Sequence, residues 1–307
     1  MTEANKENEG LACGNAHRRR YSLRMLATFF ALAFAITWGI LVPALAAVPE
    51  KSQIFFIILA AFGPLLAAVI AMRAFGGRDG LRSWLRRTLR PRLPVMLYLA
   101  GAFLLPIAIG ALHFGLYRIL GGRPDFSGAT PWPLYLAYLV PTALLTGGNE
   151  EPGWRGFALP ALLERMHPAV ATLVLGVIHA LWHLPLMARY DTTFAWYLFN
   201  ILPLTVILNW IYLRSRGSVL PVMLLHAGVN VIGSFLPSPS DVLGGLGTFV
   251  ALRGAVYWVL AIVILAATRG RLGHGASSGP ERGRIATKGR FRPKPGLHSA
   301  AWERKRS

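Results

Sequence analysis

The sequence predicts an all-α protein, a polytopic membrane helical bundle of about eight transmembrane helices. Two observations carry this prediction. Hydrophobic residues make up 54% of the 307 residues and charged residues only 15%, whereas about a quarter of the residues in soluble domains are charged. Several apolar runs also exceed the length of roughly 20 residues that a helix needs to cross a bilayer.

The candidate helices are separated by segments rich in turn-forming residues, such as PEKSQ (49–53), RYDTT (189–193) and PSPSD (237–241). The fourth and seventh candidates are short or interrupted. The helices are expected at about residues 22–48, 53–75, 95–120, 132–149, 168–188, 195–213, 218–236 and 244–268. They form a transmembrane domain over 22–268, which lies between a polar basic cytoplasmic tail (1–21) and a basic tail (269–307) that is expected to be disordered.

The charge distribution predicts the orientation. With the N-terminal tail inside, the inside segments hold 27 basic residues and the outside loops hold 4. Because basic loops stay on the cytoplasmic side, this asymmetry places both termini in the cytoplasm, with the bacterial plasma membrane as the expected location. The net charge of +19 is then explained by topology and by contact of the basic cytoplasmic loops with anionic lipid, and no nucleic-acid partner is expected.

A few polar side chains stand inside or at the end of these apolar segments. Ionisable groups are costly there and by default mark a function or a buried pairing. The two histidines of the fifth candidate helix are spaced i, i+4, as are the histidine and asparagine of the seventh, so each pair shares one helix face. These residues are Glu150 and Glu151 at the end of the fourth candidate helix, His179 and His183 in the fifth, and His226 and Asn230 in the seventh.

Such a set of residues can activate water. A carboxylate beside imidazoles can act as a general base, carboxylate and imidazole groups are also a usual zinc ligand set, and an asparagine amide can stabilise an oxyanion. Structural explanations stand beside these. A histidine in a membrane helix often hydrogen-bonds a neighbouring helix, and Glu151 and Arg155 are spaced as a simple i, i+4 ion pair.

Three motifs in order resemble those of the CPBP intramembrane proteases, the family of type II CAAX prenyl endopeptidases and bacteriocin self-immunity proteins. Glu150-Glu151-Pro-Gly-Trp-Arg155-Gly resembles the EExxxR motif, and LWHLPL with His183 resembles the second motif. RGSVLPVMLLHAGVN, with His226 and Asn230, resembles the HxxxN motif and its lead-in. The resemblance covers a core of about residues 140–235. One departure is His179, which stands where the family usually has an aromatic residue.

The resemblance implies an intramembrane endopeptidase, described in this family as a metalloprotease or as a glutamate-dependent enzyme, that cleaves a membrane-associated peptide or protein. Glu150 would be the general base, and His183 and His226 would position water or, together with Glu150, hold a divalent metal such as zinc. Asn230 would stabilise the oxyanion, while Glu151, Arg155 and His179 would support the site. A non-catalytic immunity or scaffold protein and a proton-coupled transporter remain as alternatives.

Overall fold

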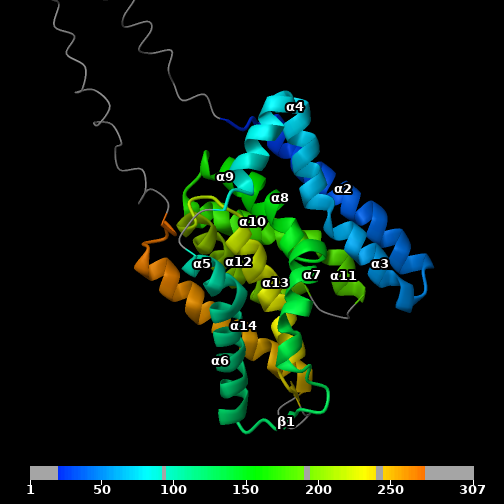
Figure 1. Cartoon of the computed structure of the whole chain (residues 1–307), viewed down its shortest axis with the longest axis vertical. Helices are drawn as coiled ribbons and strands as arrows, with labels where there is room; N and C mark the ends of the chain where they lie inside the picture. The colour runs from blue at the N-terminus through cyan, green and yellow to red at the C-terminus, as the bar shows by residue number, and fades with distance from the viewer. Residues whose placement is uncertain (1–19, 92–94, 190–193, 240–244, 274–307) are drawn as a thin grey trace, which may run out of the picture. The chain divides into compact units, whose positions relative to one another are not determined.

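The computed structural model describes residues 20–91, 95–189, 194–239 and 245–273. This part of the chain is almost entirely helical, and its two short strands form one antiparallel pair (Figure 1). Five of the described helices are long and apolar enough to cross a membrane, and two shorter apolar helices, Pro168–Trp182 and Leu220–Phe235, accompany them. The predicted all-α membrane bundle is confirmed.

The helices, labelled as in Figure 1, are α2 (Leu23–Ala47), α3 (Glu50–Ala61), α4 (Gly63–Thr88), α5 (Met96–Leu99), α6 (Leu105–Ile119), α7 (Tyr135–Leu145), α8 (Glu151–Gly153), α9 (Leu159–Leu163), α10 (Pro168–Trp182), α11 (Leu184–Arg189), α12 (Phe194–Arg214), α13 (Leu220–Val231) and α14 (Gly245–Ala267). Short 3-10 and π-helical segments are η1 (Ala100–Leu104), η2 (Trp132–Leu134), η3 (Gly148–Glu150), η4 (Trp154–Ala158) and η5 (Ile232–Phe235). Strands β1 (Pro124–Asp125) and β2 (Ser238–Pro239) pair in the register Pro124 with Pro239 and Asp125 with Ser238.

The second predicted span, 53–75, is two helices. Pro64 lies in the first turn of α4, where a residue without an N–H group starts a helix but cannot continue one. α4 then bends at Gly77, whose φ is +66°, and continues to Thr88 through a segment that the sequence predicted as a basic connection. The helix persists because Trp84 is buried there and its Nε1 donates to the carbonyl of Gly156 at 2.9 Å.

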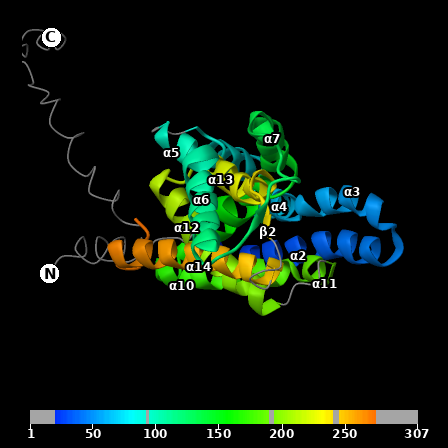
Figure 2. The same cartoon turned by 90° about the horizontal axis from the view of Figure 1, so that it is seen from below.

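Helices α2, α3 and α4 lie side by side (Figures 1 and 2). Small residues make the contact between α2 and α4 close: Ala33, Ala67, Ala68 and Ala71 are fully buried. Small side chains let two helix backbones approach, which is the usual way that membrane helices associate. The contact fixes one wall of the cavity described below.

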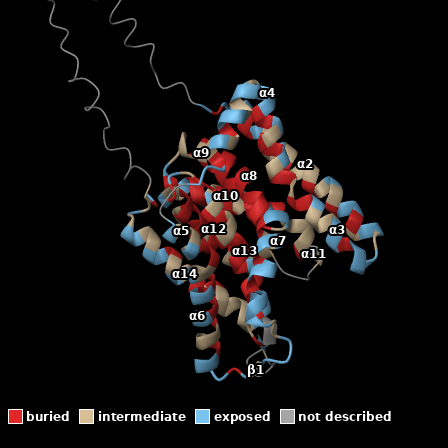
Figure 3. Cartoon of the chain, viewed as in Figure 1, coloured by how far each residue is buried: buried red, intermediate tan, exposed pale blue. Residues whose placement is uncertain are grey.

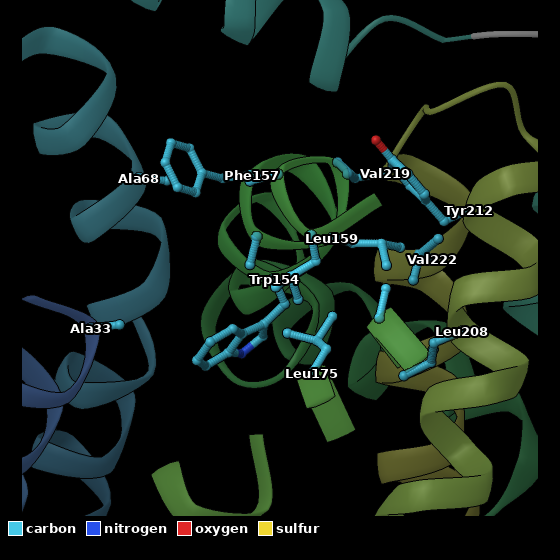
Figure 4. Packing of buried hydrophobic residues seen from close by; sticks show 14 of the residues in the cluster. Ala33, Ala68, Trp154, Phe157, Leu159, Leu175, Leu208, Tyr212, Val219 and Val222 are labelled. Atoms are coloured by element: carbon cyan, nitrogen blue, oxygen red, sulfur yellow. The ribbon is translucent and has the colours of Figure 1, made fainter. Parts of the chain in front are cut away.

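The centre of the bundle is the segment 148–163, which the sequence predicted only as a connection. It consists of η3, α8, η4 and α9, and Figure 3 shows buried residues concentrated around α8, α10, α12 and α13. Trp154, Phe157 and Leu159 of this segment are fully buried, and they lie between the α2–α4 helices and α12–α13 in Figure 4. Large apolar side chains such as Phe55, Leu112 and Val263 are instead exposed on the outside, as expected of a surface in contact with lipid.

Candidate active site

The two carboxylates follow the point where α7 ends. Gly147 has a φ of +108°, which turns the chain into the bundle, and its N–H donates to Asn149 Oδ1 at 3.0 Å. A Cβ atom at this position would lie 2.6 Å from Asn230 Nδ2, so both the backbone conformation and the space available require glycine. The turn carries Glu150 and Glu151 into the interior, where their exposed fractions are 5% and 0%.

Glu150 belongs to a cluster with His179 of α10 and His183, the residue that follows this helix. His179 Nε2 donates to Glu150 Oε2 at 3.2 Å. His183 Nδ1 donates to the carbonyl of His179 at 3.0 Å, which leaves its Nε2 with a free lone pair. The three residues each offer one ligand atom, and these atoms lie within 4.8 Å of one another. The cluster can therefore hold a water molecule or a divalent metal ion.

Glu151 belongs to a second, fully buried network. His226 Nδ1 donates to Glu151 Oε1 at 2.6 Å, and Arg155 NH1 donates to the same oxygen at 2.9 Å. Arg155 Nε donates to Asn209 Oδ1 at 3.1 Å, and Asn209 Nδ2 donates to Thr172 Oγ1 at 2.9 Å. The carboxylate is thus paired with a guanidinium and hydrogen-bonded to an imidazole, the condition under which a buried charge is tolerated.

Two tryptophans form an aromatic wall beside the first cluster. The rings of Trp154 and His179 have centroids 5.0 Å apart, and Trp154 meets Trp182 edge-on at 5.6 Å. Trp182 Nε1 donates to the carbonyl of Ala33 on α2 at 3.2 Å. The wall ties α10 to α2 and covers the histidine cluster with apolar surface.

A cavity of about 340 Å³ opens beside Glu150. Its wall is apolar on the side of α2 and α3 and more polar on the side of α7 and α13. The lining residues are Thr37, Leu41, Ile57, Ala60, Ala61, Tyr138, Thr142, Thr146, Gly147, Glu150, Trp182, His183, Leu186, Asn230, Val231 and Ser234. An apolar pocket with a few converging polar groups is the usual form of a ligand or active site.

The candidate site residues fall into two groups in the structure, one on the wall of the cavity and one behind it. Glu150, His183 and Asn230 line the cavity, whereas Glu151 and His226 stand behind it. The group that offers metal ligands contains His179 with Glu150 and His183. His226, which the sequence placed in the metal-binding set, instead turns one ring nitrogen to Glu151.

Sequence reasoning missed three residues of the site. Asn209 on α12 binds Arg155, Thr172 on α10 binds Asn209, and both residues are buried. A search limited to ionisable groups omits them, although an amide in the middle of an apolar helix is itself a signal. Gly147 was missed because nothing in the sequence shows that its φ is positive or that Asn230 lies against it.

Comparison with known proteins gives the same family as the motifs. A family model described as type II CAAX prenyl endopeptidase Rce1-like matches residues 131–232. This range contains all seven candidate site residues that the sequence predicted. This match supports the resemblance to the CPBP proteases that the motifs indicate. A CAAX prenyl protease 2 from Methanococcus maripaludis is 26% identical to it over 216 residues, which cover 66% of this chain and 78% of the relative.

The matches agree with the helical membrane fold. They support an intramembrane protease, because membrane-spanning helices and a protease family model coincide in one chain. The matched range begins before α7 and ends in η5, so it holds the turn at Gly147, His179 and His183, and helix α13 with the HxxxN motif. The helices α2 and α3, which line the other side of the cavity, lie outside it.

Proposed function

We propose that this protein is a CPBP-type endopeptidase that hydrolyses a peptide bond of a membrane-associated peptide or protein, with water activated by Glu150 and His183. The observation that carries the proposal is the meeting of Glu150, His183 and Asn230 on the wall of one cavity. A carboxylate, an imidazole and an amide in a cavity with one apolar wall are groups that can promote the attack of water on a peptide carbonyl.

Glu150 is the general base. Its carboxylate takes a proton from a water molecule in the cavity, and the water oxygen attacks the carbonyl carbon of the scissile peptide bond. The proton then passes to the leaving amine nitrogen as the C–N bond breaks. His179 donates to Glu150 Oε2 and orients the carboxylate, while His183, whose Nδ1 is bound to a backbone carbonyl, presents the lone pair of Nε2 to the same water.

Asn230 supplies the electrostatic stabilisation of the tetrahedral intermediate. Its amide lies next to Gly147, because a Cβ atom at Gly147 would be 2.6 Å from Asn230 Nδ2 and 3.4 Å from His226 Nε2. A prepared N–H donor of this kind contributes about 10²–10³-fold in rate when it is aimed at the oxyanion. Glu151 and Arg155 support it indirectly, because they hold His226 on the same helix.

A divalent metal such as zinc fits the cluster of Glu150, His179 and His183. The donor set of one carboxylate and two imidazoles is one that zinc prefers, and the three ligand atoms lie within 4.8 Å of one another. His183 has the backbone hydrogen bond at its second nitrogen that usually orients a metal-binding histidine. When bound, such an ion polarises a carbonyl oxygen and lowers the pKa of water.

The substrate that we propose is a membrane-associated peptide or protein. The archaeal relative is named for CAAX prenyl substrates. For this chain we propose membrane-associated peptides and proteins in general rather than prenylated ones alone. The wall made by Leu41, Ile57 and Leu186 is apolar and would accept any apolar segment of a substrate. The predicted orientation, with both termini in the cytoplasm, places the turn at Gly147 near the cytoplasmic side.

The proposal is tested by comparing protein N-termini, by mass spectrometry, in host membranes that carry the wild type, Glu150→Gln or the control Asp79→Asn. Asp79 is an exposed carboxyl on α4, so its variant removes the same charge away from the cavity. We expect new N-termini with the wild type and the control but none with Glu150→Gln at equal expression. Identical termini in all three would contradict the proposal and favour the scaffold or transporter function.

A further inference from the structure

The buried amide of Asn209 lies on α12, away from the cavity, and has two partners on two other helical elements. Its exposed fraction is 0%. Its Oδ1 accepts from Arg155 Nε at 3.1 Å, and its Nδ2 donates to Thr172 Oγ1 at 2.9 Å. The orientation of this amide is determined by its partners, because a guanidinium has only donors and the oxygen must therefore face Arg155.

The guanidinium of Arg155 also binds the carboxylate of Glu151. NH1 binds Glu151 Oε1 and Nε binds Asn209 Oδ1, whereas NH2 is buried and has no hydrogen-bond partner among the described residues. Two bonds in different directions fix the plane of the guanidinium. If the bond to Asn209 is removed, the single remaining bond leaves that plane free to rotate.

The position of the guanidinium matters for His226. Glu151 Oε1 accepts from both Arg155 NH1 and His226 Nδ1, at 2.9 and 2.6 Å. This hydrogen bond holds a proton on Nδ1, and Nε2 lies on the side of Gly147 and Asn230. The hydrogen-bond partner of one ring nitrogen determines which nitrogen of a histidine carries the proton. If Glu151 moves, the preference of His226 for a proton on Nδ1 weakens.

We propose that Asn209 is a positioning residue that fixes the tautomer and orientation of His226 through Arg155 and Glu151. Thr172 orients Asn209 in turn. The chain of contacts runs from α10 through α12 and η4 to the Glu151 carboxylate and ends on α13. The inference rests on the proposed function for its kinetic consequence, but the state of the imidazole is observable without any activity.

The test uses the full-length protein in bilayer vesicles, with ¹⁵N-labelled histidine and solid-state NMR. The variants are Asn209→Leu, which removes both contacts while keeping the branched shape and the number of side-chain heavy atoms, and Thr172→Val, which only frees the amide. The matched control is Thr205→Val. Thr205 is as buried as Asn209 and lies one turn before it on α12, but its hydroxyl donates to Ile201 of its own helix.

We expect the wild type and Thr205→Val to show His226 as the Nδ1–H form alone, and Asn209→Leu to show a mixture of both neutral forms. Thr172→Val should give a smaller share of the form with the proton on Nε2. If Asn209→Leu does not fold, the result for Thr172→Val tests the inference alone. On a substrate identified from the N-termini, kcat of Asn209→Leu should fall by about 10–100-fold, the usual effect of such supporting residues, with KM unchanged.

A His226 signal in Asn209→Leu and Thr172→Val that equals that of Thr205→Val would overturn the inference, whatever the activity. An altered signal together with unchanged cleavage by Glu150→Gln would instead leave the positioning role in place and refute the proposed function. If kcat falls only in proportion to the amount of folded protein, Asn209 has a structural role alone, as a contact between helices, and the inference is wrong.

Discussion

The ion pair between Arg155 and Glu151 gives the sharpest prediction about stability. Both side chains have an exposed fraction of 0%, and Arg155 NH1 lies 2.9 Å from Glu151 Oε1. In Arg155→Met the aliphatic stem is kept, so little space is lost, but the carboxylate stays buried without its cation. Removing one partner of a buried ion pair costs about 3–5 kcal/mol. We expect the lower end of this range, because His226 still donates to Glu151.

The double variant Arg155→Met/Glu151→Gln separates charge from packing. It removes both charges, and replacing a buried pair by uncharged groups of similar volume is often nearly neutral. The free energy of unfolding should therefore return to within about 1–2 kcal/mol of the wild type. Arg82→Met, at an exposed arginine of α4, serves as the control and should change stability by less than about 0.5 kcal/mol.

The assay is equilibrium unfolding in detergent micelles, followed by tryptophan fluorescence. A loss below about 1 kcal/mol for Arg155→Met would be the value of an exposed ion pair and would refute the buried arrangement. A double variant no more stable than the single one would show that the loss comes from packing rather than from the unpaired carboxylate.

Three further predictions concern the cavity and its cluster. Gly147→Ala should abolish activity without unfolding the bundle, because alanine is strained at a φ of +108° and its Cβ would lie 2.6 Å from Asn230 Nδ2; the check is cleavage per folded molecule, and normal activity would argue against the turn. After dialysis against zinc, metal analysis should find bound ion in the wild type and His226→Gln but not in His183→Ala, since His183 belongs to the group of possible ligands and His226 does not. Equal loss of zinc from both variants would favour the ligand set of Glu150, His183 and His226 that the resemblance implied. Ile57→Trp should raise KM more than it lowers kcat by filling the apolar wall, and kinetics unaffected by this change would place the substrate elsewhere.

The helices were predictable because apolar runs of membrane length leave few alternatives. The predicted 22–48 and 195–213 agree with α2 and α12 to within one residue at each end. The segment 148–163 was not predictable as the core of the bundle. Pro152, Gly153 and Pro160 resemble the residues of a loop, and only the contacts made by α2, α4, α12 and α13 turn the segment into buried helical turns.

The candidate site was predictable in its residues but not in its pairings. Spacing along a helix shows that His179 and His183 share a face, and the ion pair of Glu151 with Arg155 is present as its spacing predicted. Which carboxylate each histidine meets depends on how α10 and α13 pack around the turn at Gly147. His226 therefore pairs with Glu151, and His179 with Glu150, through contacts that no local pattern contains.

The central claim is that Glu150 activates water for peptide hydrolysis. Its most direct test is cleavage in host membranes suspended in water enriched in oxygen-18, followed by mass spectrometry of the new C-terminal peptides. The proposed function predicts C-termini that carry oxygen-18 with the wild type, and their disappearance with Glu150→Gln at equal expression. The same labelled C-termini in both membranes would show that the hydrolysis does not depend on Glu150 and would contradict the assignment of the base.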